Sequence, residues 1–217
     1  MKRLLASAAV TPLALLALGG PAVAAQPEPK PQHTTDIATY AHAEWMYESE
    51  GLYVEGGLSA VDTRNGPVLV LEQGAYSEGG AWTRTFIPED EQVSFDLTMD
   101  RARLTAAQLH ADDVPVQVCT YEAQGDEDPD CVPSTVDVSL TWTGDGPISR
   151  SGDSSHYADG TMRIITHGSY TSREATVLGS VTGAVDVDDF AASWMVRSRY
   201  IEIKRCISDT PCEEPEE

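Results

Sequence analysis

The sequence predicts an all-β fold, a single antiparallel β-sandwich of jelly-roll or Greek-key type with room for one short helix. Three segments, 93–99, 114–118 and 136–142, alternate apolar with polar residues. Such alternation is typical of strands with one buried face and one wet face. Strand-like runs recur about ten times along the chain with turn residues between them, which favours a sandwich, and a closed barrel is the structural alternative.

Shorter or less regular runs complete the set of expected strands. They are 52–54, 68–71, 82–87, 162–170, 175–185 and 193–203. Glycine, asparagine and proline separate several of them. The segment Arg64-Asn65-Gly66-Pro67 contains the Asn-Gly pair typical of a tight hairpin turn, so the runs on either side of it are expected to pair.

Two segments have helical features instead. Segment 36–48 places its apolar residues roughly at the 3.6-residue period of a helix, with Asp36 as an expected cap. Segment 101–111 is rich in good helix formers. Both are therefore candidates for the short helix.

The two ends of the chain are expected to lie outside the domain. Residues 1–25 combine Lys2 and Arg3, an apolar run and a small-residue cleavage pattern, which predicts a secretory signal peptide, with a retained anchor as the alternative. Residues 26–35 read as a proline-rich linker and residues 207–217 as an acidic tail. We therefore expect one β-sandwich domain over 36–206 in a secreted, extracellular protein.

The charge balance restricts the partners. The chain has 217 residues and a net charge of −21, which becomes −23 once Lys2 and Arg3 leave with the signal peptide. Unassisted binding to nucleic acid or to an anionic membrane needs a basic patch. We therefore expect no nucleic-acid partner and no membrane insertion after cleavage. A polysaccharide or another cell-surface partner stays open.

One basic cluster lies near the C-terminus. It consists of Arg197, Arg199, Lys204 and Arg205. We interpret these charges as an offset to neighbouring acidic strands, and a groove for an acidic partner is the alternative.

The four cysteines, Cys119, Cys131, Cys206 and Cys212, predict two disulfides in an oxidising compartment. Four cysteines allow three connectivities, of which the two local pairings, Cys119–Cys131 and Cys206–Cys212, are the expected ones. A zinc site is the alternative, but it needs closer ligand pairs than these spacings provide.

An acidic loop suggests a cation site. Asp126, Asp128 and Asp130 stand at every second position and partly imitate a calcium-binding loop, because hard cations prefer several oxygen ligands. The glycine that such loops need is replaced by Cys131. The alternative is a solvated hairpin tip beside a disulfide, so calcium is the only cofactor considered.

Aromatic residues suggest a ligand surface. Trp45, Tyr47 and Trp82 lie in polar surroundings, and exposed aromatic rings on a β-sandwich can stack on sugar rings. The alternative is ordinary core packing, which the strand phase of Trp142 indicates for that residue.

The sequence offers no specific catalytic motif. The histidines are scattered along the chain. Ser155 and His156 could belong to a serine nucleophile set, and His156 and His167 could form a metal pair. We interpret these residues instead as ordinary, partly exposed polar side chains. Our first hypothesis is a non-catalytic, disulfide-stabilised binding or interaction module. The alternatives are a carbohydrate-binding module with structural calcium and a small secreted hydrolase with a spatially assembled site.

Overall fold

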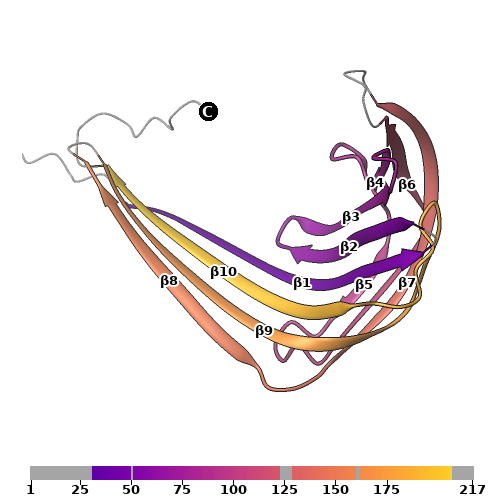
Figure 1. The fold of residues 1–217 in the computed structure, drawn as a ribbon. Coiled ribbons are helices and arrows are strands. Elements are labelled where there is room, and N and C mark those ends of the chain that lie inside the picture. Colours follow the sequence, from indigo (N-terminus) through magenta and orange to yellow (C-terminus); the bar gives the residue numbers. More distant parts are fainter. Residues whose placement is uncertain (1–30, 50, 123–128, 160–161, 207–217) are drawn as a thin grey trace, which may run out of the picture.

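The computed structural model describes residues 31–49, 51–122, 129–159 and 162–206, and all regular elements in these ranges are strands of one antiparallel sheet (Figure 1). The all-β, antiparallel prediction is therefore confirmed. The strands are β1 (Gln32–Ser49), β2 (Leu52–Thr63), β3 (Gly66–Ser77), β4 (Trp82–Phe86), β5 (Asp96–Met99), β6 (Ala106–Tyr121), β7 (Asp130–Gly144), β8 (Ser149–Ala158), β9 (Met162–Gly183) and β10 (Ala192–Cys206). The first strand begins at Gln32, inside the segment predicted as linker.

Eight of the strands pair in a closed circuit, which we call the ring. The pairings run from β1 through β2, β3, β4, β6 and β7 to β9, and then through β10 back to β1. The expected hairpin joins β2 and β3, and its two turn residues are Arg64 and Asn65, because Thr63 is paired directly with Gly66. The circuit is closed but not along the whole length of every strand: β4 pairs with β3 only over residues 72–76, so residues 66–71 of β3 have no strand partner on that side among the described residues.

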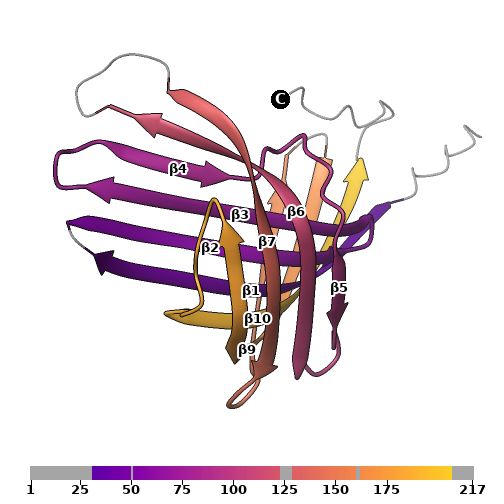
Figure 2. The same cartoon turned by 90° about the vertical axis from the view of Figure 1, so that its right-hand side faces the viewer.

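The ring encloses the hydrophobic core. Figure 2 shows β6 and β7 crossing in front of β1, β2 and β3, so that opposite parts of one sheet cover each other. Trp142 on β7 is fully buried between them, and its indole N–H donates to the backbone oxygen of His42 on β1 at 2.9 Å. The alternation predicted for 136–142 reflects this packing, since Val136, Val138 and Leu140 are buried on the same side.

Both helix predictions are wrong. Segment 36–48 lies within β1, where Thr39, Ala41, Ala43 and Trp45 are buried at every second position. Because two of these four side chains are small alanines, the strand period is weak in the sequence, and tertiary packing decides the conformation. Segment 101–111 contains a turn and the first part of β6.

Four strands extend beyond the ring as an arm. The arm comprises β8, residues 162–172 of β9, residues 197–206 of β10 and residues 32–37 of β1. These segments pair with one another except at the base, where Arg197, Ser198 and Ser172 pair with ring residues. Figure 1 shows these strand ends running together away from the ring. All ten residues of β8 are exposed, and within the described ranges no other strand covers either face of the arm.

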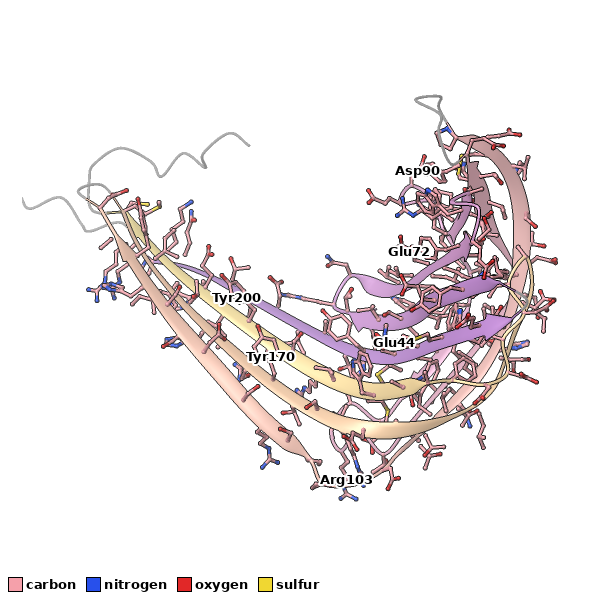
Figure 3. All side chains as sticks on the ribbon, viewed as in Figure 1. Glu44, Glu72, Asp90, Arg103, Tyr170 and Tyr200 are labelled. Carbon is pink, nitrogen blue, oxygen red and sulfur yellow. A yellow bond between two sulfur atoms is a disulfide. The ribbon has the colours of Figure 1, made fainter. Side chains whose placement is uncertain are left out.

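The sheet therefore has two faces that continue from the ring into the arm. The core face carries Ala41 and Met195, and the opposite face carries His42 and Trp194, because residues directly paired across strands share a face. We call the second one the concave face. Figure 3 shows Glu44, Glu72 and Tyr200 on it, on the inner side of the bend between ring and arm.

One predicted disulfide is present. Cys119 and Cys131 are directly paired on β6 and β7 and form a disulfide, which indicates a non-reducing environment. Cys206 ends β10, whereas Cys212 lies outside the described residues, so their pairing stays a prediction. Among the residues described, none belongs to a helix with the length and apolarity needed to traverse a bilayer.

Candidate functional site

A hollow of about 490 Å³ lies on the concave face, over the ring strands β1 to β4. Its lining combines carboxylates, hydroxyls, one guanidinium and aromatic rings. The lining residues are His42, Glu44, Trp45, Met46, Glu55, Gly56, Gly57, Ser59, Val70, Glu72, Gly74, Tyr76, Trp82, Arg84 and Ala191. Convergence of such groups on one depression makes it the candidate ligand site.

Gly57 forms part of the floor of this hollow. It is paired directly with Glu44 on one side and Glu72 on the other, so two carboxylates flank a position without a side chain. A Cβ at Gly57 would lie 3.3 Å from a ring carbon of His42, so the glycine leaves room for the imidazole. Glu72 is held by the Nε–H of Arg84 at 2.9 Å. One carboxylate of the hollow is therefore oriented by an ion pair.

Gly74 forms the neighbouring part of the floor, between Glu55 and Arg84. The Tyr76 side chain folds over this glycine, since a Cβ there would lie 2.7 Å from its hydroxyl oxygen. That hydroxyl donates to Glu55 at 3.5 Å, and the Tyr53 hydroxyl donates to Glu55 at 3.0 Å. The hydrogen bond to Glu55 is also the main reason that the pKa of Tyr53 is raised.

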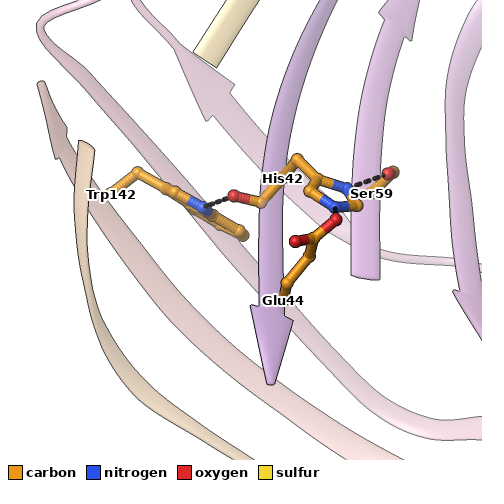
Figure 4. Close-up of polar contacts among 4 residues, drawn as sticks. All are labelled: His42, Glu44, Ser59 and Trp142. Carbon is orange, nitrogen blue, oxygen red and sulfur yellow. Dashed lines mark hydrogen bonds and ion pairs between the residues drawn. The ribbon is translucent and has the colours of Figure 1, made fainter. Parts of the chain in front are cut away.

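A polar trio lies at one side of the hollow (Figure 4). The two ring nitrogens of His42 contact the Ser59 hydroxyl at 2.6 Å and the Glu44 carboxylate at 3.2 Å. Because a carboxylate only accepts, Nε2–H donates to Glu44 and the Ser59 hydroxyl donates to Nδ1 in the neutral imidazole. The Trp194 ring packs against the imidazole with a centroid distance of 4.3 Å. The imidazole is thus held on three sides.

The trio has two of the parts of a nucleophilic site, a hydroxyl on an imidazole and a carboxylate on the same ring. It lacks a third part. His42 and Ser59 lie in central strands whose backbones pair with neighbours on both sides. The nearby backbone N–H groups are therefore engaged in the sheet, and they do not form the oxyanion hole that acyl transfer uses. The geometry favours fixed hydrogen bonding over covalent catalysis.

Four aromatic rings stand in a row beside the hollow. Tyr53, Tyr76, Trp82 and Tyr121 come from the adjacent strands β2, β3, β4 and β6. Trp82 and Tyr121 are stacked at 4.0 Å with an interplanar angle of 7°, and Tyr76 and Trp82 at 5.9 Å with 11°. Tyr53 is tilted against Tyr76 at 38°, so three of the four rings stack face to face and the row forms a wall of rings rather than a flat platform.

The three aromatic residues predicted as ligand contacts have different positions. Trp82 lines the hollow. Trp45, expected in polar surroundings, is only 1% exposed, its indole packs against Gly56, and its N–H donates to Gln73 at 3.0 Å; this corrects its placement to the core. Tyr47 is 43% exposed but does not line the hollow. The structure therefore brings Trp82 to the lining of the hollow together with the buried indole of Trp45, and it leaves Tyr47 outside.

The predicted calcium loop lies mostly outside the described residues. Asp126 and Asp128 are not described, and Asp130 is an exposed residue at the start of β7. Within the described part of the chain, no group of three or more His, Cys, Asp or Glu side chains is placed to hold a metal ion. The calcium site stays a prediction.

The residues of the weaker nucleophile and metal sets lie on the arm. Ser155 contacts the Thr166 hydroxyl at 2.7 Å, whereas His156 points to the opposite face and accepts from the Arg163 Nε–H at 2.7 Å. Adjacent residues of a strand point to opposite faces, as this pair does. His167 is paired with Ser154, so it lies on the same face as His156 and diagonal to it, and the metal pair of these two histidines stays a prediction. The arm therefore does not assemble a Ser–His set here.

No protein-family model, no curated protein and no solved structure matches the chain. The candidate site therefore depends on geometry alone.

The sequence pattern does not predict most of the hollow. Glu55, Glu72 and Arg84 belong to no motif, and His42 is one of five histidines scattered along the chain. A signal was present, because His42 and Glu44 stand two residues apart, which places both on one face of a strand. The helical interpretation of 36–48 hid it.

Proposed function

We propose that the protein is an extracellular binding module and that the hollow on the concave face is its ligand site, with a carbohydrate as the ligand. The observation that carries this proposal is the convergence of donors and acceptors around a glycine floor. Export from the cell is part of the proposal; the N-terminal pattern and the disulfide support it.

The mixture of polar groups favours a polyhydroxylated ligand. A sugar hydroxyl both donates and accepts, so it needs acceptors such as Glu44 and Glu72 and donors such as Arg84 within one site. A purely cationic ligand would be served best by acceptors alone, and a purely anionic one would be repelled by the three carboxylates. The ion pair and the tyrosine hydroxyls hold these groups in place before binding, which lowers the entropic cost of recognition.

The aromatic row contributes in a different way from a flat stacking platform. Its side nearest the hollow includes Tyr76 and Trp82, which lie with Arg84 in the lining. These rings exclude water from one side of the hollow and give the apolar C–H groups of a sugar a surface to contact. The carboxylates then orient the sugar by accepting hydrogen bonds from its hydroxyl groups.

Retention on insoluble polysaccharides, followed by a glycan array, tests the proposal. We expect the purified protein to be retained on at least one of cellulose, chitin and xylan, and Trp82→Ala or Glu72→Ala to abolish retention. Tyr47→Ala is the matched control, because it removes an exposed aromatic ring outside the hollow. Absence of glycan binding, or equal loss in the control, contradicts the proposal.

Ester hydrolysis is a second candidate function, favoured by the contact between Ser59 and His42. In that reaction the Ser59 oxygen would attack the ester carbonyl carbon, His42 would take the hydroxyl proton and return it to the departing alcohol, and water would release the acid. Fluorophosphonate labelling tests it. Labelling at Ser59 that disappears in His42→Ala would favour hydrolysis, whereas no labelling supports the binding module.

A further inference from the structure

The core face of the arm is rich in arginine, and we call it the arginine face. Five arginines from three strands lie on it: Arg150, Arg163, Arg197, Arg199 and Arg205. The register places them on one face in two groups, with Arg150, Arg197 and Arg199 near the ring and Arg163 and Arg205 at the tip, although they are up to 55 positions apart in the sequence. Arg150 and Arg197 both pair with Thr171, on either side of it. Figure 3 shows nitrogen-bearing side chains projecting from the outer side of the arm.

Two of these arginines are direct cross-strand neighbours. Arg205 on β10 is paired with Arg163 on β9. Side chains in such a pair lie about 5 Å apart at Cβ, and like charges there destabilise the sheet. An anion bound between the two guanidinium groups would offset this repulsion, so the pair indicates an anion site.

Within the described strands of the arm, no acidic residue lies on the arginine face. The carboxylates of the four arm strands, Asp36, Asp153 and Glu202, lie on the concave face, because their registers pair them with Tyr200, Gly168 and Thr166. Among the described residues, no ion pair involves any of the five arginines. Lys204, which the sequence grouped with them, lies on the concave face. A chain of net charge −21 therefore concentrates positive charge on one surface.

The base of the arm extends this surface. A hollow of about 400 Å³ lies where the arm joins the ring, and Arg64, Arg101 and Arg197 line it with Ile37. Its lining includes one carboxylate, Asp62, which is paired with Arg101. The positive surface thus reaches from the tip of the arm to the ring.

The dimensions of the arginine face fit an extended ligand. From Arg197 to Arg205, β10 rises about 3.3 Å per residue, which gives roughly 27 Å, and the four arm strands are about 14 Å across. Ile201, Ile203 and Ile165 separate the arginines near the ring from those at the tip. Guanidinium groups bind carboxylate and sulfate with two parallel hydrogen bonds. The surface therefore offers anion sites at both ends with an apolar stretch between them.

We infer that the arginine face binds a linear anionic polysaccharide bearing carboxylate or sulfate groups. Its pyranose rings would contact the isoleucines and its anionic groups the arginines. A membrane surface fits less well, because insertion needs protruding large apolar residues, and the exposed tyrosines Tyr157, Tyr170 and Tyr200 lie on the concave face. Duplex DNA fits less well, because its major groove admits an α-helix or a two-stranded ribbon and the arm has four strands. The arginine face is separate from the candidate ligand site over β1 to β4.

Binding to immobilised heparin and to polygalacturonate, compared with neutral dextran, tests the inference. We expect the full chain to bind one or both anionic polymers at 0.05 M salt and more weakly at 0.3 M, since salt screens charge. Arg197→Ser combined with Arg199→Ser is expected to weaken binding at least about tenfold. The charge-matched control is Arg103→Ser with Lys204→Ser, which removes two positive charges outside the face and is expected to change binding less than about twofold.

Four outcomes would overturn the inference. They are no binding to either polymer, equal weakening in the control, binding to anionic phosphatidylserine vesicles or duplex DNA but not to the polymers, and sedimentation that shows a dimer lost only in the Arg197 and Arg199 variant. Arg197→Lys with Arg199→Lys keeps the charge and is expected to retain part of the affinity. Trp82→Ala is expected to leave polymer binding unchanged, which separates this site from the hollow.

Discussion

The ring and the arm belong to one sheet but differ in what stabilises them. In the ring, the core face is covered by the opposite strands, and large side chains such as Trp142 and Leu58 are fully buried. In the arm, the same face is open, and it carries arginine where the ring carries valine and leucine. Continuous strands therefore pass from a packed core to a region where no other described strand covers the sheet.

The strand β9 contains both environments. Residues Val177 and Val181 in its second half are buried against β7, whereas its first half pairs with β8 and β10 in the arm. The first half pairs with strands on both sides, whereas residues 175–183 pair with β7 on one side and with Val187 through a single bridge on the other, so the second half is distinguished by side-chain burial and not by more backbone pairing. Stability should therefore come from the ring, and the arm should be free to present ligand contacts.

The largest expected effect comes from removing the central core residue. Trp142→Ala deletes a fully buried ring and its hydrogen bond to β1, so we expect a loss of about 3 to 5 kcal/mol in the free energy of unfolding. Ile201→Ala in the arm should cost less than about 1 kcal/mol, because this side chain is only partly buried. Urea denaturation of both variants measures the difference, and equal losses would remove the distinction between ring and arm.

The disulfide should give the next largest effect. Cys119 and Cys131 are 12 positions apart, and closing a loop of that length stabilises by about 3 kcal/mol in the chain-entropy account. The double variant Cys119→Ala, Cys131→Ala should lower the urea midpoint accordingly while far-UV circular dichroism keeps its strand signal. An unchanged midpoint would show that the adjacent ladder alone holds these strands.

Gly179 offers a sharper test of ring packing. It has a φ of +126°, and a Cβ there would lie 1.9 Å from the backbone oxygen of Ser139 on β7. Gly66 has a similar φ of +121° directly after the β2–β3 turn, but a Cβ there meets nothing within 4 Å. We expect Gly179→Ala to cost about 2 kcal/mol or more and Gly66→Ala about 1 kcal/mol. Similar melting temperatures in the two variants would contradict the close packing of β7 on β9.

The smallest expected effect concerns the turn before β6. Asp100 accepts hydrogen bonds from the Thr105 hydroxyl and from the N–H groups of Arg103 and Ala102, and these bonds lower its pKa below the ordinary 3.8. Because the pKa of Asp100 is lower in the folded state, its ionised carboxylate stabilises the fold at pH values above the ordinary pKa. This stabilisation is lost as the pH falls through the pKa of the folded state. Asp100→Asn should therefore flatten the fall of melting temperature between roughly pH 2 and pH 5. An unchanged dependence of the melting temperature on pH would contradict this role of Asp100.

The sequence predicted the ring better than the arm. Alternation at Val136, Val138 and Leu140 is strong because large side chains fill the core, and the Asn65-Gly66 sequence fixes its hairpin locally. In β1 the core side chains are mostly small, so a helix was expected instead. Local pattern is informative where burial demands large residues and ambiguous where alanine suffices.

The functional surfaces escaped prediction because register creates them. Nothing in the sequence places Ser59 opposite His42, or Arg205 opposite Arg163, since each pair depends on strand pairing over long separations. The net charge was also misleading as a guide to surfaces. It averages over both faces of the arm, whereas the strands sort arginine to one face and carboxylates to the other.

Hydrogen exchange along β9 tests the contrast between ring and arm most directly. We predict that the amides of residues 175–181 exchange close to the rate of global unfolding, and that those of 163–171 exchange at least about tenfold faster through opening of the arm. Mass spectrometry of overlapping peptides resolves the two halves of this one strand. Equal protection in both halves would contradict the account, because the arm would then unfold only together with the ring.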